Sequence, residues 1–155
     1  MKILVVSDSH GDFNTFNKLV QSQRKAEVVI FLGDGADEFE DIKYLYPEKM
    51  FIGVKGNNDW GSSLPVFDDR VIEGKRIFMT HGHTYGVKYG LSELQREAER
   101  RGADIALFGH THQACIKYEN GMYIMNPGSL RRYDSTYGVI DIQNGDILVN
   151  TAEFK

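Results

Sequence analysis

The strongest constraint on the fold is an alternation of short apolar runs and helical patterns in the first third of the chain. Such runs, rich in β-branched side chains, occupy residues 3–6, 28–32 and 50–54. Continuous apolar runs of this length are typical of strands that are buried on both faces. Between them, apolar residues recur at helical spacing over 13–20 and 39–46; Asp12 or Asn14 is expected to cap the first helix, and Pro47 ends the second. This β-α-β-α-β order predicts a parallel sheet with right-handed crossovers.

The remainder of the chain is expected to be richer in antiparallel strands. The expected elements are a hairpin of 70–72 and 76–79 around the turn 73–75, a helix over 92–101, a buried strand over 105–108, and strands over 137–142 and 147–151. Ser92 and Gln95 form a candidate capping box, and Gly102 is expected to follow the helix. Asn-Gly pairs at 120–121 and 144–145 predict further hairpins. Residues 1–155 are therefore expected to form one α/β domain with two facing mixed β-sheets flanked by helices.

Composition excludes several classes of protein. The formal net charge of −4 provides no general attraction for nucleic acid or an anionic membrane. The single cysteine, Cys115, excludes an intramolecular disulfide and fits a reducing compartment. The first apolar run is too short for a signal sequence or a membrane span. We therefore expect a cytoplasmic protein with no bulk nucleic-acid surface and no membrane association.

All five histidines lie in short motifs that follow apolar runs. The motifs are Ser7-Asp8-Ser9-His10, Thr80-His81-Gly82-His83 and Gly109-His110-Thr111-His112, with Gly33-Asp34 and Gly56-Asn57-Asn58-Asp59 after two other runs. Ligands of open α/β sheets bind beyond the carboxyl ends of the strands. The side chains expected to converge there are Asp8, Asp34, Asn57, His81 and His110. This combination of imidazole, carboxylate and amide oxygen predicts a site for two divalent metals.

The spacing within the motifs supports this prediction, although each motif alone has a simpler explanation. On an extended segment residues i and i+2 face the same side, so Asp8 and His10 could bind one metal. The same spacing recurs at His110 and His112. Taken singly, the aspartates could cap a helix or form a turn, and Asn57 could belong to an ordinary loop. The prediction depends on the five motifs occurring together.

The order of these motifs closely resembles that of the calcineurin-like metallophosphoesterase superfamily. The shared pattern is Asp-x-His, Gly-Asp, Gly-Asn-x-Asp, His-Gly and Gly-His-x-His, and it extends from Asp8 to His112. The short chain, the block at 126–129 and the β-rich C-terminal part resemble the small phosphodiesterase branch. The resemblance implies the αββα fold of that superfamily, a small phosphodiester as substrate, and a homodimer or higher homo-oligomer.

The resemblance also implies metal ligands and a mechanism. Asp8, His10 and His112 would hold the first ion, Asn57, His81 and His110 the second, and Asp34 would bridge both. Manganese is the expected divalent metal, although nickel, iron, cobalt or zinc would also suit these ligands. A hydroxide that bridges the ions would hydrolyse the phosphodiester, since metals lower the pKa of bound water toward about 7. The alternatives are a protein-binding scaffold on the same fold, as in the retromer coat, and a phosphomonoesterase.

Catalytic roles are expected for Asp34, Asn58 and His83. Many members of the superfamily have a histidine where this chain has Asn58, and an amide cannot usefully transfer a proton to the leaving group. His83 is expected to orient substrate or support His81, with a surface histidine as the alternative. A clamp on phosphate by Arg131 or Arg132, or a solvated pair, would both fit the sequence. Trp60, Phe67 and Tyr85 could line a pocket near the motifs or simply pack.

Overall fold

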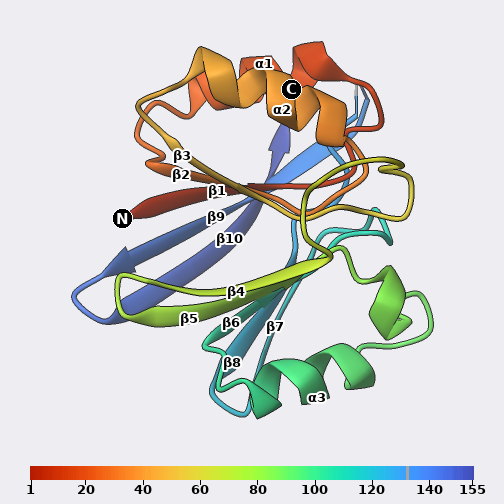
Figure 1. The fold of residues 1–155 in the computed structure, drawn as a ribbon. Coiled ribbons are helices and arrows are strands. Elements are labelled where there is room, and N and C mark those ends of the chain that lie inside the picture. The colour runs from red at the N-terminus through yellow and green to blue at the C-terminus, as the bar shows by residue number, and fades with distance from the viewer. Residues whose placement is uncertain (132) are drawn as a thin grey trace.

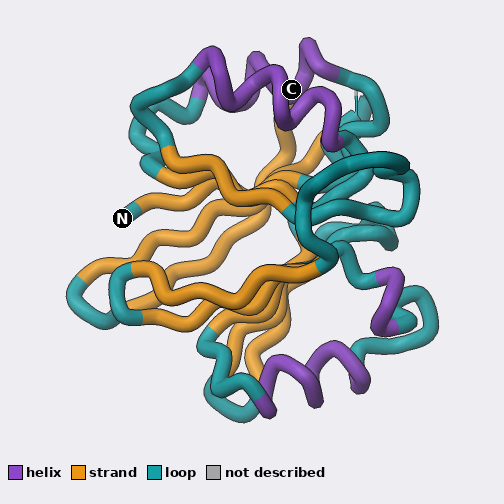
Figure 2. The backbone as a smooth tube through the Cα atoms, viewed as in Figure 1, coloured by secondary structure: helices purple, strands orange, loops and turns teal. Residues whose placement is uncertain are grey.

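The chain forms two five-stranded β-sheets stacked face to face, with helices on both outer surfaces (Figures 1 and 2). The structure is a computed structural model, and it describes residues 1–131 and 133–155. This arrangement confirms the predicted αββα architecture of two mixed sheets flanked by helices. None of the helices in the described ranges combines the length and apolar character needed to cross a membrane.

The first sheet has the strand order β10–β9–β1–β2–β3. Its strands are β1 (Lys2–Val6), β2 (Val28–Phe31), β3 (Met50–Gly53), β9 (Ser135–Gln143) and β10 (Asp146–Phe154). Strands β1, β2 and β3 are parallel, as the apolar runs predict, and β9 and β10 extend the sheet as an antiparallel hairpin. Helices α1 (Phe13–Ser22) and α2 (Ala36–Leu45) cover its outer face (Figure 1).

The second sheet has the strand order β4–β5–β6–β8–β7. Its strands are β4 (Phe67–Ile72), β5 (Lys75–Thr80), β6 (Ile105–Leu107), β7 (Cys115–Glu119) and β8 (Met122–Asn126). The central strands β5, β6 and β8 are parallel, and β4 and β7 pair antiparallel at the two edges. Helix α3 (Ser92–Arg100) packs on the outer face, and a short 3₁₀ helix, η1 (His83–Tyr85), follows β5 (Figure 1).

The apolar runs are continuous because each inner strand is buried on both faces. In β1, Ile3 and Val5 belong to the core between the sheets. Leu4 and Val6, which alternate with them, pack beneath α1 and α2. This period-two alternation places all four side chains of residues 3–6 in an apolar layer. The rigid central strands hold the loops at their carboxyl ends in fixed positions.

The structure confirms the predicted hairpin turns and the cap of α1 but not the predicted capping box of α3. Both central residues of all three hairpin turns, at 73–74, 120–121 and 144–145, have positive φ, as type I′ turns require. Asp12 caps α1 by accepting a hydrogen bond from the Thr15 amide. The capping box predicted for Ser92 and Gln95 is wrong. Ser92 is itself the first helical residue, one position too late to cap α3, and Gln95 donates instead to a glutamate one turn later.

Candidate metal centre

Two groups of carboxylate and imidazole side chains lie at one edge of the sandwich. The first group is Asp8, His10 and His112, and the second is Asp34, His81 and His110. Within each group the ligand atoms lie within 4.8 Å of one another. They come from the loops that follow β1, β2, β5 and β6, where the strands run parallel within each sheet. The fold therefore brings these six side chains together at the carboxyl ends of the strands.

The first group contains a buried carboxylate oxygen without a hydrogen bond. Oδ2 of Asp8 accepts hydrogen bonds from the Ser7 hydroxyl at 2.5 Å and from the His110 amide at 3.0 Å. Oδ1 of Asp8 accepts none from residues 1–131 and 133–155, although Nε2 of His112 lies 3.2 Å away and Nε2 of His10 lies 3.5 Å away. A buried oxygen of this kind requires a partner. Oxygen and two imidazole nitrogens in this arrangement fit a divalent cation.

The second group is oriented by a backbone contact. Nε2 of His81 lies 3.3 Å from Oδ2 of Asp34 and 3.1 Å from Nδ1 of His110. The other ring nitrogen of His81 lies 2.7 Å from the carbonyl oxygen of Leu32, which fixes the orientation of this fully buried ring. A metal-ligating histidine commonly uses its second nitrogen in this way. Nε2 of His81 is thereby directed toward the carboxylate.

Asp34 lies between the two groups. Its Oδ2 is 3.3 Å from Nε2 of His81 in its own group and 3.8 Å from Nε2 of His10 in the other. Asn58 donates to it twice, from its backbone amide to Oδ1 and from its side-chain amide to Oδ2, both at 2.9 Å. Asp34 is therefore in a position to contact ions in both groups, and Oδ1 of Asp8 also lies 3.9 Å from Nε2 of His81 in the second group.

The electrostatics keep Asp34 ionised. Burial raises its pKa, but His81 and the hydrogen bonds from Asn58 outweigh burial and hold the pKa well below its usual range. For His81 burial acts in the opposite direction and lowers the pKa. Asp34 and Asp8 outweigh burial, so the pKa of His81 is raised. Burial is the largest cause of the lowered pKa of His110. The centre thus combines the ionised carboxylate of Asp34 with imidazoles, which bind metals in their neutral form.

The backbone at the ligands differs from the extended geometry expected from the sequence. That expectation for the Asp-x-His and His-x-His motifs is wrong, because their residues have left-handed φ values. The φ values are +57° at Asp8, +44° at His10, +61° at Asp34, +70° at His110 and +64° at His112. Residues other than glycine seldom adopt this region, and such outliers gather at functional sites. The turns, rather than a pleated strand, bring the side chains of each motif together.

Asp59 and Glu38 hold the ligand loops, and no motif in the sequence specifically signals either role. The Asp59 carboxylate accepts hydrogen bonds from four backbone amides, those of Asp34, Gly35, Ala36 and Gly56, at 2.7–2.9 Å. Oε2 of the buried Glu38 accepts from the Ser9 hydroxyl at 2.7 Å and the Gly11 amide at 2.9 Å. These bonds hold the backbone at Asp34 and on both sides of His10. In the sequence Asp59 is the last residue of the Gly-Asn-x-Asp motif, which does not indicate that it anchors backbone amides, and Glu38 resembles an acid in a first helical turn.

Two glycines allow the loops to approach one another closely. A Cβ at Gly33 would lie 2.6 Å from the Gly56 amide nitrogen and 2.7 Å from Nδ1 of His81. A Cβ at Gly56 would overlap Oδ1 of Asp34 and lie 2.7 Å from the backbone nitrogen of that residue. Contacts this short exclude any side chain. Both glycines are therefore required by the packing around Asp34.

The other candidate residues lie in different surroundings. Asn57 is exposed beside Asn58 in the loop after β3, and its predicted ligand role stays a prediction. The ring centroid of His83 lies 5.4 Å from that of His81 and 6.1 Å from that of His110. Trp60 lines a cavity beside the centre. The other two aromatic candidates pack elsewhere: Phe67 and Tyr85 both contact Phe78.

The two arginines that were candidates for a phosphate clamp are only partly placed by the structure. Arg131 lies close enough to His112 to add to the lowering of its pKa, whose main cause is burial. Arg132 lies outside the described residues. Neither arginine is needed to form the two ligand groups, since every carboxylate and imidazole in them comes from residues 8–112. A phosphate clamp by Arg131 therefore stays a hypothesis beside the alternative of a solvated arginine.

The fold and the two ligand groups together define a metal-dependent phosphoesterase, and comparison with known proteins identifies its family. A model described as the calcineurin-like phosphoesterase superfamily domain matches residues 1–145. Probable metallophosphoesterase YsnB of Bacillus subtilis is 32% identical over 152 residues, which cover 93% of this chain and 86% of that protein. The chain belongs to the calcineurin-like phosphoesterase superfamily.

More distant relatives and solved structures agree with this assignment. Phosphodiesterase YfcE of Escherichia coli is 25% identical over 169 residues, which cover 91% of this chain and 88% of that protein. The crystal structure of a predicted phosphoesterase from Streptococcus pneumoniae superposes with a TM-score of 0.83 at 26% identity, covering 98% of this chain and 88% of the other. Vps29 of Entamoeba histolytica, crystallised with zinc, shares the fold, with a TM-score of 0.77 at 21% identity and full coverage of both chains.

Proposed function

We propose that this protein is a phosphodiesterase that uses two divalent metal ions, with manganese as the expected metal and nickel, iron, cobalt or zinc as alternatives. The observation that carries the proposal is the position of Asp34 between two ligand groups, together with the unpartnered buried oxygen of Asp8. Asp8, His10 and His112 would hold one ion. His81 and His110 would hold the other with Asn57, and Asp34 would contact both. A cytoplasmic location and a homo-oligomer are part of the same proposal.

The chemistry follows from the ligands. Two divalent ions would act as Lewis acids on a phosphate and lower the pKa of a bound water toward about 7. The chain itself contributes positioning: the Leu32 carbonyl directs His81, and Asn58 holds Asp34. His83 packs against His81 and would restrict that ring from a second side. These contacts keep the ligands in place before substrate arrives.

Specificity for diesters is the finer part of the proposal. Asn58 stands where many members of the superfamily have a histidine, and its side-chain amide donates to Asp34. An amide cannot deliver a proton to a departing alkoxide. We therefore expect substrates with weakly basic leaving groups to be hydrolysed best. The scaffold alternative has a fold relative in Vps29, but the full set of carboxylate and imidazole ligands favours an enzyme.

The test is a manganese titration of chelator-stripped protein with bis(p-nitrophenyl) phosphate as substrate. Activity should appear with the metal, and calorimetry should count two ions per chain. Asp34→Asn should lose more than about 100-fold in activity, because it removes the shared ligand. Asp41→Asn, an exposed change on α2, is the matched control and should retain activity. Absence of hydrolysis with any divalent metal would reject the enzyme and favour the scaffold.

A further inference from the structure

An unusually exposed tryptophan stands beside the metal centre. Trp60 is 90% exposed, although tryptophan is ordinarily among the more buried residues on average. It lies three residues after Asn57, in the loop that follows β3. It lines a cavity of about 380 Å³ together with His10, Asp34 and Asn58. A large aromatic surface is thus presented to solvent within the same cavity as residues of the candidate metal centre.

From this position we propose that Trp60 determines substrate specificity by stacking on an uncharged aromatic ring in one ester group of the phosphodiester. The inference rests on the proposed function, and it deepens that proposal by naming the substrate class. Stacking on an exposed aromatic side chain selects flat rings of many kinds and tolerates differences in their polar edges. A nucleoside or an aryl group on the phosphate would therefore qualify, whereas a small alkyl group would not.

The backbone on either side of Trp60 is held by hydrogen bonds, so the loop that presents the indole is already ordered. Its neighbour Asp59 accepts four backbone hydrogen bonds. The Asp59 amide donates to the Gly56 carbonyl at 3.2 Å, and the Ser62 amide donates to the Asp59 carbonyl at 3.3 Å. The first of these turns ends immediately before Trp60, and the second spans it. Binding a ring to a platform already in place avoids the cost of ordering the loop.

The charges in the cavity favour a neutral ring over a second phosphate. The described residues that line it include no lysine or arginine. Of its acidic members, Glu38 and Asp59 are engaged with hydroxyl and amide donors, and Asp37 is exposed in the first turn of α2. The amides at the start of α2 already donate to Asp59, so this helix end offers little to another anion. The cavity therefore suits an uncharged ester group.

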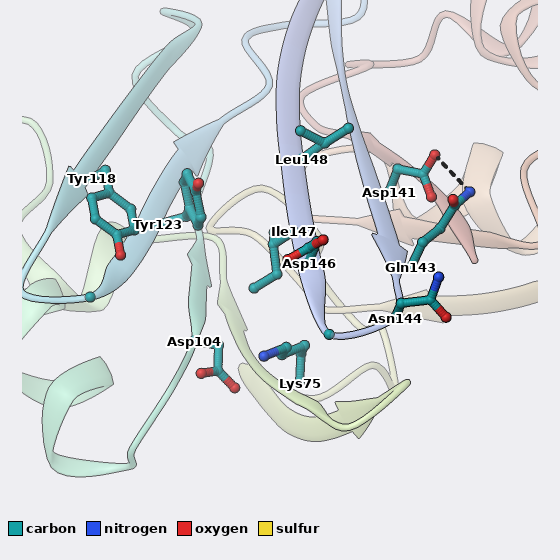
Figure 3. Close-up of a pocket in the computed structure, with 12 residues that line it drawn as sticks. Lys75, Asp104, Tyr118, Tyr123, Asp141, Gln143, Asn144, Asp146, Ile147 and Leu148 are labelled. Atoms are coloured by element: carbon teal, nitrogen blue, oxygen red, sulfur yellow. Dashed lines mark hydrogen bonds between the residues drawn. The ribbon is translucent and has the colours of Figure 1, made fainter.

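One larger cavity, at the far end of the sandwich, is not an alternative place for this ring. A space of about 650 Å³ is lined by residues such as Lys75, Asp104, Tyr123 and Leu148 (Figure 3). Lys75 begins β5, whereas His81 directly follows the end of that strand. The larger cavity thus lies at the opposite end of the sandwich from the metal centre. A ring bound there would be separated from a phosphate at the ligands by the length of a strand.

The first test uses the fact that Trp60 is the only tryptophan in the chain. Its fluorescence is recorded while the protein is titrated with phenyl phosphate or methyl phosphate. The protein is loaded with zinc because paramagnetic manganese would quench the emission. These two probes carry the same phosphate and differ in the ring. Phenyl phosphate should change the emission intensity and wavelength at saturation, and methyl phosphate should change them much less. An emission spectrum unaltered by saturating phenyl phosphate would overturn the inference.

The second test measures the same two affinities by calorimetry in variants. Wild type should bind phenyl phosphate roughly tenfold more tightly than methyl phosphate. Trp60→Ala should lose that preference, and Trp60→Phe should keep most of it. Tyr89→Ala removes another aromatic side chain, 96% exposed at a different cavity, and should leave the preference unchanged. A preference that survives in Trp60→Ala would refute the assignment.

These binding measurements separate the inference from the proposed function. Hydrolysis of bis(p-nitrophenyl) phosphate with no dependence of ring binding on Trp60 would reject the inference alone. Ring binding that depends on Trp60, without hydrolysis of any diester, would support the recognition site and reject the enzymatic proposal.

Discussion

Replacing Asp59 by asparagine should destabilise the protein strongly, although the two side chains have nearly the same shape. Oδ1 of Asp59 accepts from the amides of Gly35 and Ala36, and Oδ2 accepts from those of Asp34 and Gly56. Asparagine provides one oxygen and one NH₂ group. Whichever way its amide is turned, two backbone amides will face a donor instead of an acceptor.

The magnitude follows from the two lost bonds. Hydrogen bonds to a charged acceptor contribute about 1.5–3 kcal/mol each, so two account for about 3–6 kcal/mol. Asp59 is partly exposed, and water can hydrate the freed amides in part. The lower end, about 3 kcal/mol, is therefore expected. For a chain of this size that loss corresponds to a fall in Tm of about 6–12 °C.

Urea denaturation followed by circular dichroism measures this loss, with Asp41→Asn as the matched control. The control lies on the exposed side of α2 and should change stability by no more than about 0.5 kcal/mol. Metal affinity, measured by calorimetry, should fall by about 10–100-fold in Asp59→Asn, because the bonds fix the backbone of Asp34. If Asp59→Asn costs less than about 1 kcal/mol, or no more than the control, the reasoning is refuted.

Two further substitutions test other parts of the site. Gly56→Ala should lower the free energy of unfolding, measured in urea, by more than about 3 kcal/mol, because its Cβ would overlap Asp34. The control Gly61→Ala, in open space at φ +75°, should lower it by only about 1–2 kcal/mol. Equal losses would show that the close approach at Gly56 is unimportant. Asn58→His should accelerate hydrolysis of diesters with strongly basic leaving groups more than that of p-nitrophenyl esters, by supplying a proton donor, and an equal effect on both would contradict this role.

The sequence predicted the fold wherever burial imposed a pattern. The runs at 3–6 and 28–32 became the inner parallel strands, because a strand covered on both faces must be apolar throughout. The last two strands are each nine residues long, several more than their apolar alternation indicated. Their ends are set by the antiparallel ladder from Ser135 to Phe154, which depends on pairing rather than on side-chain polarity.

The candidate site was predictable in its ligand types and not in its geometry. The motifs identified Asp8, Asp34 and the histidines, because residues that follow neighbouring parallel strands must meet at one edge. The left-handed turns could not be read from those motifs, since aspartate and histidine adopt several backbone conformations. The anchoring role of Asp59 depends on four amides, three of them more than 20 residues earlier in the chain. Local sequence carries no signal for such a contact.

The left-handed backbone at five of the ligands would make the amount of folded protein depend on metal supply. Each such residue costs of order 1 kcal/mol relative to a relaxed turn, a sum that is substantial beside a total stability of about 5–15 kcal/mol. Bound ions offset this cost only in the folded chain. Metal starvation would therefore increase the unfolded fraction that proteases remove, and the enzyme would become scarce as well as inactive.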